Sequence, residues 1–436
     1  MPSALSATWI ILAAVAANLA LRLWLSTRQI RFVSGHADTV PAAFAAAIRP
    51  EEHARAARYT IAKQRFAIVE MLGEGLLFAL LTWGGGIRLV REALDARLGT
   101  GFAGELALVG AIFALLAVAD LPLEWFRQFR LEQRFGFNRM TPGMFALDAL
   151  KTALLAIALG TPLAAAVLAC MHSAGPWWWL AAWAVWTVFT LALTAAYPRW
   201  IAPIFNRFTP LADGPLLDRI GALLARTGFR SNGVYTMDGS RRSSHGNAYF
   251  AGLGGARRIV FYDTLIERLQ ADEVEAVLAH ELGHFRLHHV RKRMIAGMLS
   301  SLFGLALLGW LSRQDWFYGA LGVPVAPNGP DGSHDGLALV LFALVVPWFA
   351  LFLAPIRSAY SRRHEFEADA FAAENASAAA LVRALVKLYQ DNAATLTPDP
   401  LHSLFYDSHP PAAARIGRLA AEGTDRRRRR AGPGPF

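Results

Sequence analysis

Residues 337–354 read LALVLFALVVPWFALFLA, a run without a single charged side chain. A helix that crosses a membrane needs about 20 predominantly apolar residues, because the hydrocarbon core is about 30 Å thick. Inside lipid, a lone segment can satisfy all of its backbone hydrogen bonds only as a helix. This stretch therefore predicts a transmembrane helix.

Six further apolar stretches of the same kind lie upstream, at residues 7–21, 68–83 (extended by the glycines at 84–86), 106–119, 153–171, 177–196 and 294–311. We expect about seven spans. The composition agrees, since 55% of residues are hydrophobic and only 17% are charged, against about a quarter in soluble domains. A soluble protein with an apolar core would not need so many long stretches. Residues 7–21 predict an anchor, because Arg22 follows them, the reverse of a signal peptide.

Basic side chains flank the predicted spans on one side, whereas the loop between the last two spans holds three aspartates against a single arginine, Arg313. The basic side chains include Arg22, Arg28, Arg31, Arg127, Arg130, Arg134, Arg139, Lys292, Arg293, Arg362 and Arg363. The positive-inside rule then predicts an outside N-terminus and a cytosolic C-terminus. The net charge of +10 is thus explained without nucleic acid. The basic run at 426–430 either contacts anionic lipid or forms a solubilising tail. The Ala-, Arg- and Leu-rich composition suggests a bacterial inner membrane.

A polar region between the fifth and sixth spans contains His280-Glu281-Leu282-Gly283-His284. We expect Asp272 to cap this helix, with Glu275 completing a capping box. Histidines four apart share a helix face and can meet one metal ion, while the glutamate can take a proton from a water molecule at the open coordination position. The alternative is a helix that merely contains histidines, since His288 and His289 also lie nearby.

A catalytic zinc with two histidine ligands needs a third protein ligand, commonly a carboxylate. After the last span, Glu365 and Asp369 are four residues apart and share a helix face. One could bind the metal and the other could orient a ligating imidazole. Glu367 lies on the opposite face. Alternatively, these acids only pair with Arg362 and Arg363.

The chain resembles the CAAX prenyl protease type 1 family of polytopic membrane metalloendopeptidases. Five segments match that family in order: 135–138 (FGFN), 247–250 (NAYF), 280–284 (HELGH), 365–369 (EFEAD) and 408–411 (SHPP) with Arg415. The match covers nearly the whole chain. One departure is Glu367, where such proteins often have Gln.

The resemblance implies a role for each matched residue. One zinc ion per chain is bound by His280, His284 and Glu365. Glu281 is the general base, Asp369 supports a zinc ligand or donates a proton, and His409 faces the scissile carbonyl oxygen. The substrate-binding residues are an edge strand and an arginine: Asn247, Ala248, Tyr249, Phe250 and Arg415. His409 could equally be a surface histidine before a helix that starts at the prolines.

We therefore expect an α-helical polytopic membrane protein with an inserted small α/β zinc-peptidase domain. In the polar region, a helix at 216–226 and strands at 234–237, 247–253 and 258–263 are predicted, with a turn at Gly254-Gly255. The expected parts are a membrane region with about five spans (1–197), a cytosolic-side peptidase domain (198–292), two further spans (293–356), the C-terminal part of the peptidase domain (357–422) and a basic tail (423–436).

The expected reaction is zinc-dependent hydrolysis of peptide bonds. The family removes the C-terminal tripeptide from prenylated proteins, so the expected partners are a peptide or protein substrate, prenylated or related to one, and membrane lipid. Two alternatives remain open. One is a quality-control protease for membrane proteins. The other is a metal-regulated transporter, which would predict inverted repeats or broken helices that the sequence does not display.

Overall fold

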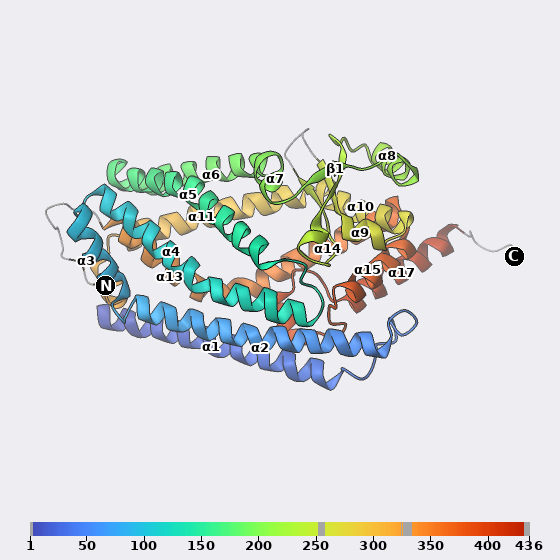
Figure 1. The fold of residues 1–436 in the computed structure, drawn as a ribbon, viewed down its shortest axis with the longest axis horizontal. Helices are drawn as coiled ribbons and strands as arrows, with labels where there is room; N and C mark the ends of the chain where they lie inside the picture. Colours follow the sequence, from blue (N-terminus) through green and yellow to red (C-terminus); the bar gives the residue numbers. More distant parts are fainter. Residues whose placement is uncertain (1–2, 252–257, 324, 326–333, 431–436) are drawn as a thin grey trace.

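The long helices run lengthwise or obliquely through the molecule in the computed structural model (Figure 1). The structure describes residues 3–251, 258–323, 325 and 334–430, with side chains as far as residue 421. The long helices are α1 (Ala4–Gly35), α2 (Pro50–Leu81), α4 (Phe102–Phe126), α5 (Pro142–Ser173), α6 (Trp178–Ala196), α11 (His289–Leu311), α13 (Asp335–Ala350) and α14 (Ala354–Asn375). The turn predicted at Gly254-Gly255 lies outside the described residues.

Six helical segments in the described chain are long and apolar enough to cross a membrane, or seven if the bent pair of α2 and α3 (Gly86–Leu98) counts as one span. Large apolar side chains point outward from these segments; Trp9 is 65% exposed and Phe303 is 71% exposed. Such a surface is unfavourable in water and suits lipid. The prediction of a polytopic protein with about seven spans is confirmed.

The second span differs from its predicted form. We expected one helix from residue 68 through the glycines, but α2 ends at Leu81 and the axis bends by 50° before α3 begins. Gly85 takes a left-handed conformation with φ of 78°, which side chains with a Cβ rarely adopt. A Cβ on Gly84 would lie 2.7 Å from the Leu80 carbonyl oxygen. The glycines therefore end the helix.

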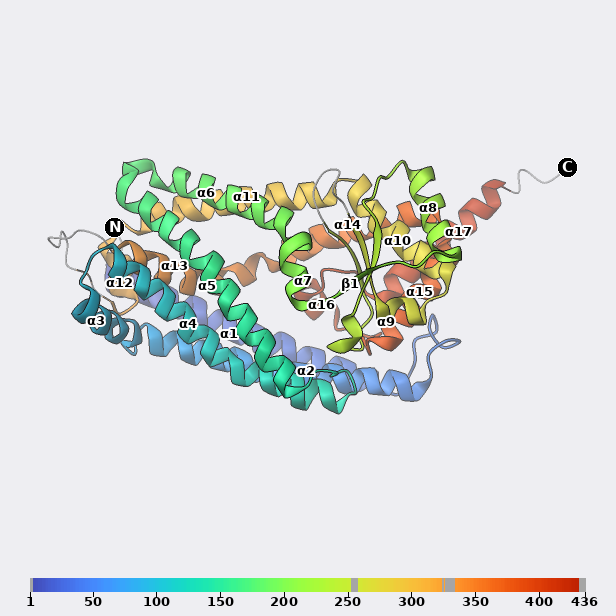
Figure 2. The same ribbon diagram turned by 45° about the horizontal axis from the view of Figure 1, so that its top comes forward.

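A small sheet and several short helices gather at one end of the long helices (Figures 1 and 2). The sheet order is β1-β2-β4-β3, and β2 pairs with β4 in parallel while both outer pairs are antiparallel. The strands are β1 (Phe208–Pro210), β2 (Val234–Met237), β3 (Ala248–Ala251) and β4 (Arg258–Tyr262). Three strands were predicted; β1 was missed because three residues carry too little pattern.

The remaining helices surround this sheet or connect the long helices. They are α7 (Ala202–Phe205), α8 (Pro215–Thr227), α9 (Asp263–Arg268), α10 (Ala271–Arg286), α12 (Asp315–Ala320), α15 (Ala378–Asp391), α16 (Pro400–Tyr406) and α17 (Ala412–Arg430). The helix predicted at 216–226 is α8, which ends at Gly228 in the left-handed conformation. One apolar core joins the sheet to α8, α10 and α15. It holds α10, which carries the His-Glu-x-x-His motif, in a fixed position.

The start of α10 corrects the predicted cap. The helix begins at Ala271 after Gln270, whose backbone N–H donates to Glu273 Oε2 at 2.9 Å. Asp272 and Glu275 are therefore not the capping pair. Glu273 takes that role because it is only 1% exposed and its carboxylate accepts a hydrogen bond from Lys387 on α15 at 2.7 Å. The tertiary contact outweighs the local sequence pattern.

Candidate metal centre

Two helices bring three ligand atoms together in the interior. His280 and His284 lie on α10 and Glu365 lies on α14. The two histidine Nε2 atoms are 3.3 Å apart. Glu365 places Oε2 3.4 Å from His280 Nε2 and Oε1 3.3 Å from His284 Nε2. All three residues are buried, so the structure joins a motif to a carboxylate 81 positions beyond it.

The triangle fits a tetrahedral zinc ion. Ligands at about 2.0–2.1 Å from zinc at tetrahedral angles are roughly 3.3–3.4 Å from one another. The two Nε2 atoms have this separation, and each of them lies at such a distance from one oxygen of the Glu365 carboxylate. Glu365 Oε2 is also buried without a hydrogen-bond partner among the described residues. A buried carboxylate oxygen in that position calls for a cation or a water molecule. Two imidazoles and a carboxylate are the donor set of a catalytic zinc site that leaves one position open.

Gly283 allows the two helices to approach closely enough to form this triangle. A Cβ at this position would lie 3.0 Å from Ala368 Cα and 3.1 Å from Phe371 Cβ. Contacts between carbon atoms are normally about 3.5–4.0 Å. Glycine at the third position after His280 therefore sets the distance between α10 and α14.

Asp369 fixes the orientation of the His280 ring. Its Oδ1 lies 2.8 Å from His280 Nδ1, so the ring donates from Nδ1 and leaves its Nε2 lone pair toward the metal position. Arg415 donates to both oxygens of the same carboxylate, at 2.8 and 2.6 Å. Burial by itself lowers the pKa of Arg415, but the hydrogen bond to Asp369 raises it, and the net change is upward. The guanidinium thus stays charged and holds Asp369 ionised.

The pKa of His280 is raised to about 9. Burial alone lowers this pKa, and the neighbouring carboxylates of Asp369 and Glu365 outweigh that effect. A metal ion that binds to Nε2 would therefore displace a proton at neutral pH. The pKa of Glu281 is also raised from its ordinary value, chiefly by burial, although His280 and His284 oppose the shift. A raised pKa brings a carboxylate closer to the range of an effective general base.

His409 reaches the same triangle from the segment before α17. Its Nε2 lies 3.5 Å from Glu365 Oε2, and Ser408 Oγ lies 3.1 Å from its Nδ1. The side chain is 60% exposed, yet the surrounding protein atoms desolvate the ring and lower its pKa. A neutral ring that accepts from Ser408 at Nδ1 carries its proton on Nε2, which faces the centre.

The predicted substrate strand is β3, at one edge of the sheet. Its residues Ala248, Tyr249 and Phe250 pair with β4 on one side only among the described residues. Asn247 precedes the strand, and its carbonyl accepts from the Tyr262 N–H at 2.9 Å. The Phe250 ring packs edge-on against Phe285, next to His284, with ring centroids 4.8 Å apart. The unpaired edge thus lies beside the motif helix. Arg415, also predicted to bind substrate, is buried against Asp369.

A second group of metal-type side chains adjoins the first and was not predicted. His289, His364 and Glu367 place one potential ligand atom each within 4.8 Å of one another. His289 Nδ1 lies 3.0 Å from His284 Nδ1, and His289 Nε2 lies 2.9 Å from Glu367 Oε2. His288, four residues after His284, takes a left-handed conformation between α10 and α11. The helical spacing along α10 could not predict the contact between His284 and His289, because His289 belongs to the next helix, α11.

Comparison with known proteins agrees with this geometry. Residues 29–207 match the model of the CAAX prenyl protease N-terminal region with five membrane helices, and residues 210–422 match peptidase family M48. CAAX prenyl protease 1 homolog of Arabidopsis thaliana is 32% identical over 92% of this chain and 94% of its own length. CAAX prenyl protease 1 of Saccharomyces cerevisiae is 32% identical over 92% and 93%. The crystal structure of S. mikatae Ste24p superimposes with a TM-score of 0.87 at 29% identity, covering 96% of this chain and all of that one.

The helical membrane region, the inserted sheet and the buried donor set together define a membrane-embedded metalloendopeptidase of the zinc-dependent M48 class. Within that class, the chain belongs to the CAAX prenyl protease 1 family. The resemblance drawn from the five sequence segments is therefore confirmed. The transporter and quality-control alternatives are not favoured by these relatives.

Proposed function

We propose that the chain hydrolyses peptide bonds with one zinc ion held by His280, His284 and Glu365. The observation that supports this most strongly is the meeting of the two Nε2 atoms, 3.3 Å apart, with the Glu365 carboxylate, whose Oε2 and Oε1 lie 3.4 and 3.3 Å from His280 and His284. A zinc ion held there would polarise the scissile carbonyl and lower the pKa of water at its open position. The remaining chemistry belongs to the side chains around it.

Glu281 is the proposed general base. It takes a proton from the attacking water and passes it to the leaving amine. His409 donates from Nε2 to the negative charge that develops on the scissile carbonyl oxygen. Ser408 donates to His409 Nδ1 and so keeps the proton of the ring on Nε2. Asp369, held by Arg415, orients His280.

The test uses the full chain purified in detergent. We expect about one zinc per chain, loss of peptide cleavage with chelator, and recovery when zinc returns. Glu281→Gln should keep the zinc and lose turnover. Glu275→Gln is the matched control on the same helix, because Glu275 pairs with Arg219 and Arg226 on α8. Cleavage by Glu281→Gln at the wild-type rate would refute the proposed base.

For the substrate, we propose the C-terminal segment of a prenylated protein, as the names of the relatives indicate for those proteins. The edge of β3, unpaired among the described residues, supports an extended peptide, whose backbone would pair with Ala248, Tyr249 and Phe250 as an added strand. The position of this edge beside α10 would carry the peptide toward the metal. Backbone hydrogen bonds recognise the extended conformation of a peptide more than its side chains. Such pairing therefore suits substrates whose C-terminal sequences differ.

Matched peptides distinguish this substrate from a general one. A farnesylated peptide that ends in a CAAX sequence should be cleaved once, three residues from its C-terminus. The same peptide without the farnesyl group, and one with an amidated C-terminus, are the controls. Equal rates for all three would favour a broader peptidase with the same metal chemistry.

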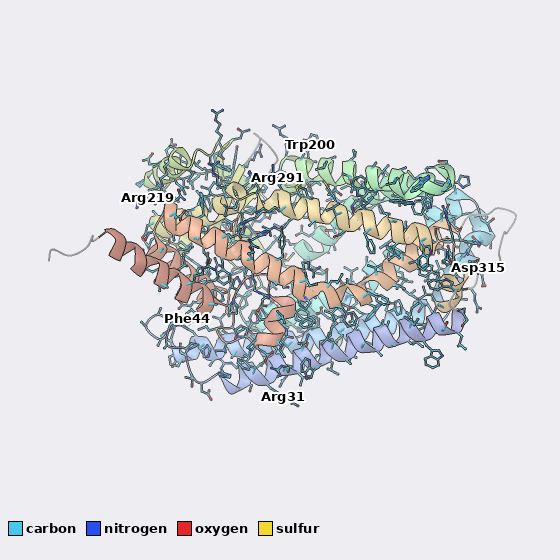
Figure 3. The ribbon with its side chains drawn as sticks, turned by 180° about the vertical axis from the view of Figure 1, so that it is seen from behind. Arg31, Phe44, Trp200, Arg219, Arg291 and Asp315 are labelled. Atoms are coloured by element: carbon cyan, nitrogen blue, oxygen red, sulfur yellow. The ribbon has the colours of Figure 1, made fainter. Side chains whose placement is uncertain are left out.

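We also propose that the sheet and the C-terminus face the cytosol. The support is the distribution of charge along the chain. In Figure 3 the labelled Asp315 lies at the end opposite to Arg219, with Arg291 toward the peptidase end. The positive-inside rule places the arginine-rich end in the cytosol.

A bacterial inner membrane and the five-part division of the chain stay predictions; the relatives described above are eukaryotic. An alkaline phosphatase fused at the C-terminus should be inactive in a bacterial host.

A further inference from the structure

Among the described residues, the Nδ1 atom of the second proposed zinc histidine, His284, faces a ring nitrogen and not a carboxylate. His280 donates from Nδ1 to Asp369, but His284 Nδ1 lies 3.0 Å from His289 Nδ1, a ring nitrogen. His289 is completely buried at the first turn of α11. Its other nitrogen, Nε2, lies 2.9 Å from Glu367 Oε2. The three side chains form a line of hydrogen bonds that leads away from the metal position.

The positions of the protons along this line follow from counting. His284 turns Nε2 toward His280 and Glu365, so a neutral ring that binds metal there carries its proton on Nδ1. Two ring nitrogens 3.0 Å apart require one proton between them. His289 must then accept at Nδ1 and carry its own proton on Nε2. That proton points at Glu367 Oε2, 2.9 Å away, which accepts it.

We propose that His289 and Glu367 form a positioning relay for His284. Glu367 accepts from His289, and His289 accepts from His284, which fixes the tautomer and the ring orientation of the zinc ligand. The relay does for His284 what Asp369 does for His280, with one imidazole inserted. The inference rests on the proposed function, because it takes His284 as a ligand.

The surface end of the relay is held by an arginine. Arg363 Nε donates to the other oxygen of Glu367 at 2.9 Å, and its side chain is 78% exposed. Glu367 is one-third exposed, and so it is the accessible member of the relay. A carboxylate gives a stronger acceptor than an amide at this place. This gives a physical role to the position where the chain departs from the family's usual Gln.

The same proton count argues against a second metal site at His289, His364 and Glu367. A cation bound at His289 Nε2 would force the His289 proton onto Nδ1. It would then face the proton on His284 Nδ1 at 3.0 Å, and two donors would oppose each other. His364 contributes packing instead: its ring stacks on His289 with centroids 4.0 Å apart and an interplanar angle of 11°.

Zinc affinity, measured by competition with a chromogenic chelator, tests the relay on the full chain. His289→Phe keeps an aromatic ring for the stack but removes both nitrogens. Glu367→Ala removes the acceptor at a partly exposed position. A substitution there should leave the protein folded. We expect each to weaken zinc binding roughly 10- to 100-fold, and Glu367→Gln, which still accepts a hydrogen bond, to weaken it less. With saturating zinc, KM should be unchanged.

The double variant provides the decisive comparison. Glu367 acts only through His289, so His289→Phe with Glu367→Ala should bind zinc as weakly as His289→Phe alone. His364→Phe is the control and should stay within about threefold of wild type, because His364 packs on His289 without a place in the line of hydrogen bonds. Full additivity in the double variant would overturn the proposal.

Other outcomes are equally distinct. Two zinc ions per wild-type chain, with the second lost in His364→Phe, would overturn the relay and establish a second site. If wild type binds one zinc and the relay variants bind it equally well, the relay fails while the proposed function stands. If wild type binds no zinc but still cleaves peptide, the proposed function itself fails.

Discussion

Replacing Gly283 by alanine tests whether the close approach of α10 and α14 builds the metal centre. The added Cβ would lie 3.0 Å from Ala368 Cα and 3.1 Å from Phe371 Cβ, so the helices must separate by several tenths of an ångström to reach ordinary contact. The first of these is a backbone atom and cannot rotate away. Forced packing of this kind costs about 1–3 kcal/mol.

Part of this cost is offset within the helix itself. Alanine is favoured over glycine by about 1 kcal/mol in a helix interior, so the free energy of unfolding should fall by only about 0–2 kcal/mol. The metal centre should suffer more, because ligand distances tolerate only about ±0.2 Å. A loss of about 1–2 kcal/mol there corresponds to roughly 5- to 30-fold weaker zinc binding.

Chelator competition and thermal unfolding, each run beside Gly221→Ala, would measure both effects. Gly221 lies in α8, and a Cβ there would meet nothing within 4 Å. The control should therefore keep its zinc affinity and gain up to about 1 kcal/mol in stability. Equal zinc affinity in Gly283→Ala and wild type would refute the idea that glycine sets the ligand geometry.

Three further results are expected. Asp369→Asn should weaken zinc binding or activity about 10- to 100-fold without abolishing either; zinc titration would detect it, and complete loss would make Asp369 a ligand. His409→Ala should lower kcat about 100-fold with KM nearly unchanged, and a normal kcat would return His409 to an ordinary surface role. The base form of Glu281 is lost as pH falls through its raised pKa, so the acid limb of kcat/KM should lie above 4.5, the ordinary glutamate value; a pH profile that stays flat below that value would contradict the assignment.

The membrane helices could be read from the sequence because lipid imposes length and composition together. Residues 337–354 sufficed for one span, and the others followed by the same rule. Where a helix bends was harder to predict. Gly84 is crowded by the backbone of Leu80 and Gly85 takes a left-handed conformation. A hydropathy pattern contains neither of these backbone features.

Some residues of the candidate metal centre could likewise be predicted from the sequence, and others could not. His280 and His284 are tied by helical spacing, and their neighbour Glu281 follows with them. The donor set that zinc prefers predicted a carboxylate ligand from the pair Glu365 and Asp369, and the family resemblance assigned it to Glu365. Only the packing of α10 on α14 brings that side chain near the histidines. His289 was beyond reach: it lies five residues after His284 and on a new helix, and its contact depends on the left-handed turn at His288.

Glu367 illustrates a correct inference that was incomplete. The helical wheel placed it away from Glu365 and excluded it as a shared ligand. The structure agrees that it points elsewhere, but it meets His289, which itself touches His284. A wheel describes one helix, whereas this contact joins α10, α11 and α14.

The most direct test of the whole account is an anomalous difference map recorded at the zinc edge from crystals of the full, active chain. The account predicts one peak per chain, about 2.0–2.2 Å from His280 Nε2, His284 Nε2 and a Glu365 carboxylate oxygen. A peak among His289, His364 and Glu367 instead, or no peak in protein that still cleaves peptide, would contradict it.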